Sequence, residues 1–262
     1  MVRSMPNAYL DEIFGLRGRT AVVTGGSSGI GRSMAIALGR AGARVILVAR
    51  RAEPLFEVAD ELAKHGAEGY AISADLADRA ALTAAVDKIK DAYGDPDVLV
   101  NSAGVNRRPP MDELTEDDWD VTMSANLTAP FRLGQAFGPR MAAKGWGRII
   151  NVASQQAFRA CGNSGAYGAS KAGLVGLTRS QAEAWSPHGV CCNVIAPGVV
   201  HTPLTEATFA DPAKVAQHAA RTMIGRNGVP DDFGACAVFL ASDAAVAVTG
   251  QTLFVDGGYS AT

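Results

Sequence analysis

Several features that mark common protein classes are scarce in this sequence. Aromatic residues make up only 6% of the 262 residues, which suits close-packed helices on a sheet better than an all-β design. The four cysteines form no C-x-x-C pair, and the four histidines are scattered without ligand spacing. We therefore expect neither a disulfide framework nor a bound metal. Reduced cysteines are typical of a cytoplasmic protein.

Charge and hydropathy exclude other classes. The formal net charge is −2, with no basic cluster that would indicate nucleic-acid binding and no acidic tail. No apolar run approaches the roughly 18 residues that a membrane span needs. The N-terminal stretch MVRSMPNAYLDEIFGLRGR carries charges where a signal peptide needs an apolar core. We therefore expect a soluble cytoplasmic protein that binds neither nucleic acid nor a membrane.

What the sequence does contain is a regular series of strand-like runs. Apolar residues make up 48% of the chain, enough for one domain over residues 1–262, with 1–15 as an N-terminal extension. Short β-rich runs begin at residues 20, 44, 69, 97, 147, 190 and 251. Their cores show little strict alternation, which is typical of strands buried on both faces.

Helical patterns separate these runs. They cover residues 30–40, 53–65, 78–93, 115–143, 167–185 and 230–241. The order predicts βαβ units and an α/β fold, a doubly wound parallel β-sheet of the Rossmann type with helices on both faces. We expect breaks in the longest helix because Pro130 and Pro139 lie inside it. The pattern is weaker from residue 198 to about 224, which we interpret as a flap.

A glycine-rich turn, TGGSSGIGR, follows the first predicted strand. Glycine allows a tight turn and a close approach of the backbone to a ligand. The helix that begins near Ile30 presents free N–H groups and a positive dipole end to a pyrophosphate. An ordinary strand–helix turn is the alternative, but a position in the first βα unit favours dinucleotide binding. The expected contacts are Gly25, Ser27, Ser28, Gly29 and Ile30.

The end of the second predicted strand is expected to meet the adenosine ribose. A site for NAD often has an acidic side chain there, but this strand ends in Ala49, Arg50 and Arg51. Arginine suits a 2′-phosphate through its charge and paired donors. We therefore favour NADP(H), with Arg50 as a contact. NAD(H) is the alternative if both arginines simply point into solvent.

Two further strand ends carry candidate cofactor contacts. Asp75 follows the third strand where an adenine ring would lie, although Asp75 or Asp78 could equally cap the next helix. The run NSAG ends the fourth strand, and its small residues would let the backbone pass close to a cofactor. A plain strand-end turn is the alternative. The expected contacts are Asp75, Leu76, Asn101, Ala103 and Gly104.

The stretch SGAYGASKAG places Tyr167 and Lys171 at positions i and i+4 of a predicted helix, on one face. Lowering a tyrosine pKa from about 10 to about 7 requires roughly 4 kcal/mol. A cation about 4 Å away contributes a similar amount at an effective dielectric constant near 20. The pair can therefore form an acid/base catalyst. An exposed helix face is the more common meaning of this spacing.

Two other residues belong with this pair. Ser154 ends the fifth predicted strand, at the edge where open α/β sheets bind ligands, although a serine there is by default a turn residue. Asn126 lies within the long predicted helix, where asparagine is a mediocre helix former and can mark a kink or hold a water.

Taken in order, these motifs resemble the short-chain dehydrogenase/reductase family. The resemblance rests on TGGSSGIG, NSAG, SANLTAP, Ser154 with YGASK, APGVVHTP and the closing VDGG, and covers residues 16–258. It implies that Tyr167 is the general acid/base and that Lys171 lowers its pKa and binds the nicotinamide ribose. It also implies that Ser154 positions the carbonyl and that Asn126 holds a water in a proton relay. The implied contacts of the nicotinamide carboxamide are Pro197, Gly198, Val200 and Thr202.

One position departs from the family pattern. The family usually has a second asparagine where this chain has Ser102. A shorter side chain could loosen a structural contact behind the cofactor. It does not touch the implied proton path, so the expected activity is unchanged.

Within the family, the run SAGVNRRPP resembles gluconate 5-dehydrogenase and related sugar-acid dehydrogenases. Arg107 or Arg108 could bind a substrate carboxylate, or both could be solvated. Gln155 and Gln156 follow Ser154 and could meet hydroxyls. The resemblance implies a secondary alcohol or ketone substrate, a sugar acid or polyol. The expected substrate contacts are Arg107, Gln155 and Gln156.

Two alternatives to this function stay open. One is a β-ketoacyl carrier-protein reductase, which would need a basic patch for its acidic carrier. The other is a nucleotide-binding sensor without catalysis, although such proteins normally lose the tyrosine or the lysine. The family resemblance also implies a homotetramer or homodimer, with the helices over 115–143 and 167–185 as candidate interfaces because they are rich in small residues.

Overall fold

The computed structural model describes residues 8–261, and the statements below concern these residues. Residues 1–7 of the predicted N-terminal extension lie outside this range. The rest of the extension forms a short helix, α1 (Ala8–Phe14), which the sequence analysis missed. None of its residues is buried, so it has no apolar stripe to reveal it. No helix within residues 8–261 is long and apolar enough to cross a bilayer.

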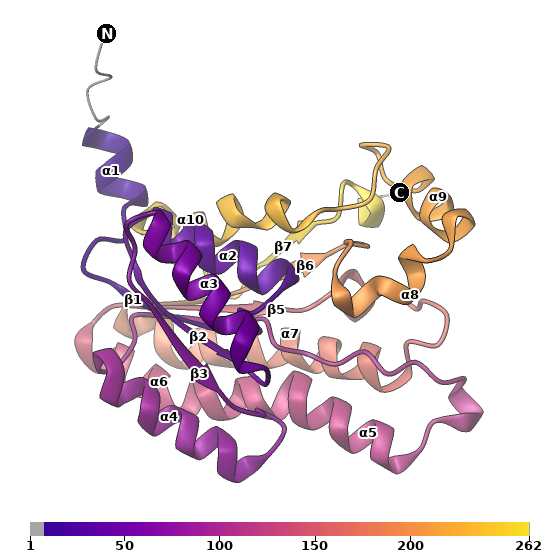
Figure 1. Ribbon diagram of the computed structural model, residues 1–262, viewed down its shortest axis with the longest axis horizontal. Coiled ribbons are helices and arrows are strands. Elements are labelled where there is room, and N and C mark those ends of the chain that lie inside the picture. The colour runs from indigo at the N-terminus through magenta and orange to yellow at the C-terminus, as the bar shows by residue number, and fades with distance from the viewer. Residues whose placement is uncertain (1–7, 262) are drawn as a thin grey trace, which may run out of the picture.

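Seven parallel strands form one sheet in the order β3-β2-β1-β4-β5-β6-β7 (Figure 1). All seven predicted strands are present. The residues of β1, β4 and β5 are buried throughout, which explains why their sequences do not alternate. The strands are β1 (Thr20–Thr24), β2 (Arg44–Ala49), β3 (Gly69–Ser73), β4 (Val98–Asn101), β5 (Gly147–Val152), β6 (Val190–Pro197) and β7 (Thr252–Val255).

Helices cover both faces of the sheet, as predicted. Figure 1 shows α2, α3 and α10 on one side and α4 to α7 on the other. Buried residues such as Leu38, Leu62 and Phe233 fill the first interface, and Ile89 and Phe137 belong to the second. These helices are α2 (Gly29–Arg40), α3 (Ala52–Lys64), α4 (Arg79–Tyr93), α5 (Glu116–Met123), α6 (Ala129–Lys144), α7 (Gly165–Trp185) and α10 (Gly234–Ala241).

The long predicted helix over 115–143 is interrupted once. A π-helical turn, Ser124–Thr128, separates α5 from α6. Pro130 follows directly after this turn as the second residue of α6. The break expected at Pro139 does not occur, because α6 continues through that residue. The interruption therefore centres on the segment that contains Asn126.

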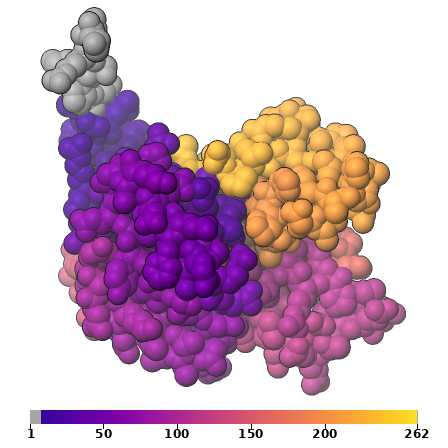
Figure 2. All heavy atoms as spheres, viewed as in Figure 1, coloured from indigo at the N-terminus to yellow at the C-terminus, as the bar shows by residue number. Residues whose placement is uncertain are grey.

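The segment with the weak pattern forms a flap of two short helices, α8 (Glu206–Phe209) and α9 (Pro212–Ala220). Neither helix buries a residue, and Figure 2 shows them as part of an orange lobe. At the base of the flap Val200 pairs with Gly228. The Met223 N–H donates to the Gly257 carbonyl oxygen at 2.8 Å. The flap is therefore held mainly at its base.

The sheet order also defines where a ligand can bind. Strands β2 and β3 are added on one side of β1, and β4 to β7 are added on the other side. The connections that follow β1 and β4 therefore diverge to opposite faces of the sheet. In open α/β sheets the crevice at the carboxyl ends of two such strands is the usual ligand site. The glycine turn follows β1 and the NSAG run follows β4, so both border this crevice.

Phe137 provides a test of the core beneath the site. Its side chain is fully buried against the sheet, so Phe137→Ala should lower the free energy of unfolding by about 3–5 kcal/mol. Phe56, which is 59% exposed on α3, is the matched control, and Phe56→Ala should change it by about 0.5 kcal/mol or less. Urea unfolding measures both. Equal effects of the two changes would contradict this assignment of the core.

Candidate active site

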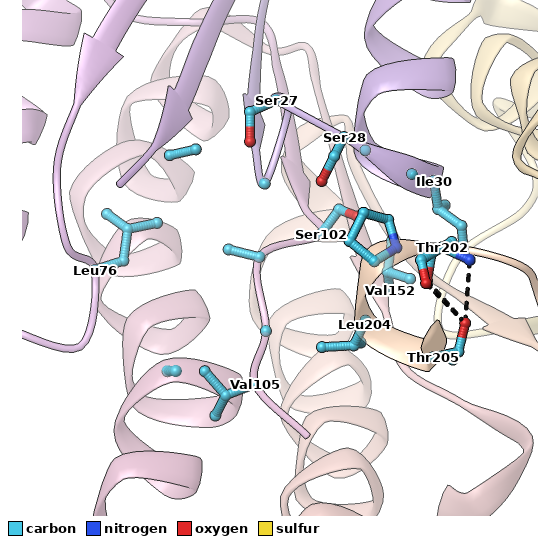
Figure 3. Close-up of a pocket in the computed structure, with 18 of the residues that line it drawn as sticks. Ser27, Ser28, Ile30, Leu76, Ser102, Val105, Val152, Thr202, Leu204 and Thr205 are labelled. Atoms are coloured by element: carbon cyan, nitrogen blue, oxygen red, sulfur yellow. Dashed lines mark hydrogen bonds between the residues drawn. The ribbon is translucent and has the colours of Figure 1, made fainter. Parts of the chain in front are cut away.

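A cavity of about 400 Å³ opens at the carboxyl ends of β1, β2, β4 and β5. Figure 3 shows side chains from the β1–α2 turn, the end of β4 and the flap facing the same space. Most residues predicted as cofactor contacts line it: Gly25, Ser27, Ser28, Gly29, Ile30, Arg50, Asp75, Leu76, Ala103, Gly104, Tyr167, Lys171, Pro197, Gly198, Val200 and Thr202. Leu204 and Thr205 also line the cavity. They were not predicted, because the flap carries no clear sequence pattern.

The N-terminus of α2 opens directly onto the cavity. Its N-cap residue, Ser28, makes no side-chain capping bond, so the first N–H groups keep their donors for an anion. Gly25 and Gly29 have φ values of +69° and +53°, which favour glycine. A Cβ on Gly31 would lie 2.3 Å from the Gly25 carbonyl oxygen. The glycines are therefore required to fold the turn as well as to admit a ligand.

The far end of the cavity is positively charged. Arg50 and Arg51 line it beside Asp75, and the Ser73 hydroxyl donates to the Arg50 carbonyl oxygen at 2.8 Å. Asp78, not Asp75, caps α4, since its carboxylate accepts from the Ala81 N–H at 2.7 Å. Free N–H groups, small residues and two arginines in one elongated cavity fit a dinucleotide that carries an extra phosphate.

Asn101 is the exception among the predicted cofactor contacts. It does not line the cavity, because its side chain turns into the sheet and its Nδ2 donates to Asn151 Oδ1 at 2.8 Å. Asn151 in turn donates to Thr178 and Gln181 on α7 at 2.8 Å and 3.1 Å. Asn101 and Asn151 are partners in the β4–β5 register, so their matching positions in two buried strands are the signal for this network.

Ser102, the position that departs from the family pattern, is held through its backbone. The Ser102 and Ala103 N–H groups both donate to the Thr24 hydroxyl at 3.1 Å. The Ser102 hydroxyl would lie 3.2 Å from a Cβ on Gly31. The end of β4 is thus tied to the end of β1 although the family's asparagine is absent.

Ser154, Tyr167 and Lys171 come together at the other end of the cavity, and all three are buried. The Ser154 hydroxyl lies close enough to the Tyr167 phenol to lower its pKa. Lys171 Nζ lies 5.8 Å from the centre of the Tyr167 ring and donates to the Val152 carbonyl oxygen at 2.8 Å. The helix α7 therefore presents the predicted pair to the ends of β4 and β5.

The electrostatics differ from the expectation for this pair. Burial raises the pKa of Tyr167 above its ordinary value, while the Ser154 hydroxyl and the charge of Arg108 lower it. Burial also lowers the pKa of Lys171 to about 8. Lys171 donates to Val152, and burial, not the lysine, is the largest influence on the pKa of the phenol. Tyr167 is thus protonated at neutral pH in this structure.

Asn126 lies in the π-helical turn, and both donors of its amide bond protein groups. Its Oδ1 accepts from the Val105 N–H at 2.8 Å, and its Nδ2 donates to the Val105 carbonyl oxygen at 3.0 Å and to Ser170 at 3.1 Å. Both amide protons are used, so the side chain clamps the loop after β4. A Cβ on Gly104 would lie 3.1 Å from Asn126 Oδ1 and 3.6 Å from Lys171 Nζ. Only glycine leaves that space open.

The predicted substrate residues separate into two groups. Arg107 points to the surface and pairs with Asp117 and Asp118 at 2.7 Å and 3.0 Å. Its neighbour Arg108 instead lies over the Tyr167 ring, 5.1 Å from its centre. Arg108 also donates to Gln156 Oε1 at 2.8 Å. Of the two arginines, Arg108 and not Arg107 therefore lies near Tyr167.

Gln155 and Gln156, both predicted to meet substrate, differ in the same way. Gln156 is partly buried and reaches Arg108. Gln155 is buried, does not line the cavity, and its Oε1 has no hydrogen-bond partner within residues 8–261. Neither glutamine lines the cavity, and Gln156 is linked to the neighbourhood of Tyr167 only through Arg108.

Comparison with known proteins identifies this arrangement. A family model described as enoyl-(acyl carrier protein) reductase matches residues 25–260. The chain belongs to the short-chain dehydrogenase/reductase family. Relatives in the family are named as NAD- or NAD(P)-dependent dehydrogenases, and the chain is an oxidoreductase of this class that acts on CH–OH groups.

Individual relatives of this dehydrogenase match nearly the whole chain. D-threitol dehydrogenase from Mycolicibacterium smegmatis is 42% identical over 96% of both chains. Gluconate 5-dehydrogenase from Gluconobacter oxydans is 38% identical over 94% of this chain and 96% of its own. A gluconate 5-dehydrogenase from Burkholderia cenocepacia, solved with NADP and tartrate, is 37% identical with a TM-score of 0.91, covering 96% and 99%. The resemblance to sugar-acid dehydrogenases is thus confirmed.

The buried Lys171 gives a stability prediction. Its pKa falls from 10.5 to about 8 on folding, so between these values the unfolded chain binds more protons and stability rises with pH. The cost of burying the charge, about 3 kcal/mol, is fully present below pH 8. Lys171→Met should therefore stabilise this dehydrogenase at pH 7 by up to that amount, and by less at about pH 9.5.

Urea unfolding at both pH values measures this gain. The exposed Lys88, on α4, provides the control, since Lys88→Met removes a lysine charge without relieving any burial. A loss of stability in Lys171→Met at pH 7 would contradict the prediction. So would an equal gain in both variants.

Proposed function

We propose that this protein is an NADP(H)-dependent dehydrogenase that interconverts a secondary alcohol and a ketone on a sugar acid or polyol. The observation that carries the proposal is the buried group of Ser154, Tyr167 and Lys171, which line one cavity. They lie at one end of a cavity whose other end combines the α2 N-terminus with Arg50. An acid/base group and a dinucleotide-shaped cavity in one crevice are what a hydride-transfer enzyme requires.

The cavity supplies separate groups for each part of the cofactor. The first turn of α2 would bind the pyrophosphate and Arg50 the 2′-phosphate. Lys171 would hold the nicotinamide ribose, with Thr202 near the carboxamide. Bound NADP(H) accepts or supplies the hydride. Relatives solved with NADP, from Burkholderia cenocepacia and from Beutenbergia cavernae, support this preference.

The catalytic residues would move the proton at the substrate oxygen. Ser154 would donate a hydrogen bond to that oxygen, and Tyr167 would donate or accept its proton. The raised pKa of Tyr167 keeps the phenol protonated at neutral pH, the form that can donate the proton to a ketone oxygen while the cofactor supplies the hydride. Asn126 would act through Val105 by holding the loop after β4 beside Lys171. We also propose that Asn126 holds a water in a proton relay to Lys171.

The relatives support the substrate class and leave the individual substrate open. Their names include a D-threitol dehydrogenase, which acts on a polyol, and gluconate 5-dehydrogenases, which act on a sugar acid. We also propose a homodimer or homotetramer, because Trp119 on α5 and Phe131 on α6 are 41% and 44% exposed on the predicted interface helices. The free cysteines support a location in the reducing cytoplasm.

A carrier-protein reductase is the second candidate. The description of the matching family model favours it, as does a 3-oxoacyl-[acyl-carrier-protein] reductase from Escherichia coli that is 36% identical over 92% of this chain. Its substrate would be a ketone on a thioester rather than a polyol. Reduction of a β-ketoacyl thioester, measured beside the sugars, distinguishes the two.

The proposed function is tested by a cofactor-linked screen of D-gluconate, related sugar acids, polyols and their keto forms, with NAD(H) and NADP(H) in parallel. Turnover of at least one compound is expected. Tyr167→Phe should abolish that turnover, because the phenol carries the proton, while cofactor binding measured by fluorescence titration stays nearly intact. No turnover by the wild type would exclude the sugar class. Persistent turnover in the variant would exclude Tyr167 as the catalyst.

Arg50 tests the cofactor preference. Arg50→Ala should raise the KM for NADP(H) by about ten- to a hundredfold, because it removes a charge-assisted bond to the 2′-phosphate. The KM for NAD(H) should change little. Arg40→Ala, which removes an exposed arginine at the other end of α2, should change neither value. Equal effects on the two cofactors would contradict a 2′-phosphate site at Arg50.

A further inference from the structure

The C-terminal turn, residues 256–261, is held tightly although it follows the last strand of the sheet. The Asp256 carboxylate accepts hydrogen bonds from the Gly258 N–H at 3.0 Å and the Ser260 N–H at 2.8 Å. These bonds fold the turn back on itself, and Tyr259 within it is only 4% exposed. Figure 1 shows the turn in yellow next to the orange flap. Terminal segments are usually poorly ordered unless other parts of the chain hold them.

Two arginines from distant parts of the chain meet the Tyr259 ring. Arg159 lies in the loop after β5, with its guanidinium 5.5 Å from the ring centre, and donates to the Tyr259 and Ser260 carbonyl oxygens at 3.2 Å each. Arg221, the residue after α9, has its guanidinium 4.4 Å from the same ring centre. A guanidinium within about 6 Å of an aromatic ring centre is attracted by the ring electrons. One ring therefore connects the loop after β5 to the flap.

The flap is also joined to the C-terminal turn through its backbone. The Met223 and Ile224 N–H groups both donate to the Gly257 carbonyl oxygen, at 2.8 Å and 3.3 Å. A Cβ on Gly257 would lie 2.7 Å from Ile224 Cγ1, and a Cβ on Gly258 would lie 2.7 Å from Met223 Cγ. Because α8 and α9 bury no residue, this contact with the C-terminal turn is a main support of the flap.

Both segments that meet at the C-terminal turn border the large cavity. The loop after β5 runs from Ser154 to the start of α7, which carries Tyr167, and Arg159 lies between these two residues in the chain. The flap contributes Leu204 and Thr205 to the cavity lining. The C-terminal turn does not itself line this cavity. It can therefore influence a bound ligand only through the loop and the flap.

We propose that the C-terminal turn couples the flap to the loop after β5, with Tyr259 as the positioning residue that holds both. The loop and the flap then open and close as one unit, so a ligand that orders the flap also orders the loop that follows Ser154. Tyr259 takes no part in proton or hydride transfer. The inference goes beyond the proposed function, because the coupling is the same whichever alcohol or ketone is the substrate.

Hydrogen exchange of the ligand-free protein tests the coupling in both directions. Arg159→Gln, a change in the loop, should speed amide exchange in α9 by about two- to tenfold, because the flap loses part of its support. Arg221→Gln, a change in the flap, should speed exchange at residues 157–163 by a similar factor. Lys214→Gln is the matched control, since this flap cation pairs with Asp211 instead. It should leave residues 157–163 unchanged.

Variants of Tyr259 itself test whether the ring carries the coupling. Tyr259→Leu removes the aromatic ring, and should speed exchange in the loop and in the flap together. Tyr259→Phe keeps the ring and with it the attraction of both guanidinium groups, so exchange in both segments should stay close to that of the wild type. If Tyr259→Phe behaves as Tyr259→Leu does, the ring is not the positioning group.

Addition of NADP provides the readout on ligand binding. In the wild type NADP should slow exchange at residues 25–31, in the flap and at residues 157–163, although the last do not line the cavity. In Tyr259→Leu the slowing should persist at residues 25–31 and be lost at residues 157–163. Exchange at residues 25–31 reports cofactor binding by itself, so a failure of the proposed cofactor site is seen separately, and the ligand-free comparison still decides the coupling.

Three results would overturn the coupling. One is an effect of Arg159→Gln that stays within the loop, and another is an effect of Arg221→Gln that stays within the flap. The third is protection of residues 157–163 by NADP that survives in Tyr259→Leu.

Discussion

The burial of the Lys171 ammonium is the constraint on which the rest of the active site depends. A charge removed from water must be hydrogen-bonded, and the acceptor is the Val152 carbonyl oxygen at the end of β5. Lys171 reaches it only because α7 lies close to the sheet edge and Gly104 leaves space beside Nζ. The small residues of the α7 start permit that approach. The position of the lysine and its lowered pKa thus have the same cause, which is burial at the sheet edge. Tyr167, one turn earlier on α7, is buried at the same place.

Three asparagines hold the elements around this charge in place. Asn101 and Asn151 join β4 to β5, and Asn151 continues to Gln181 on α7. Asn126, in the π-helical turn, clamps the Val105 backbone and so closes the loop after β4 over the lysine. Amides suit this task because each both donates and accepts. The end of the cavity around Lys171 and Tyr167 is consequently built on buried hydrogen bonds between regular elements.

The side of the cavity proposed for the substrate is built differently. The flap buries no residue of α8 or α9, and Arg108 and Gln156 lie on connecting segments. Loops of this kind can change without disturbing the sheet. That division explains how relatives at 36–42% identity bear the names of a threitol dehydrogenase, a gluconate 5-dehydrogenase and a carrier-protein reductase. The cofactor side is common to the fold, and the substrate side is adjustable.

The sequence by itself determined the seven strands, the glycine turn and the order of Asn126, Ser154, Tyr167 and Lys171, because buried strands and helix faces leave local patterns. It could not separate Arg107 from Arg108, since that depends on acids and a ring brought together by folding. Only the tertiary structure decided that the side chain of Asn101 turns into the sheet, and that burial, not the lysine, is the largest influence on the Tyr167 pKa. Desolvation is a property of everything packed around a group, and no spacing along the chain records it.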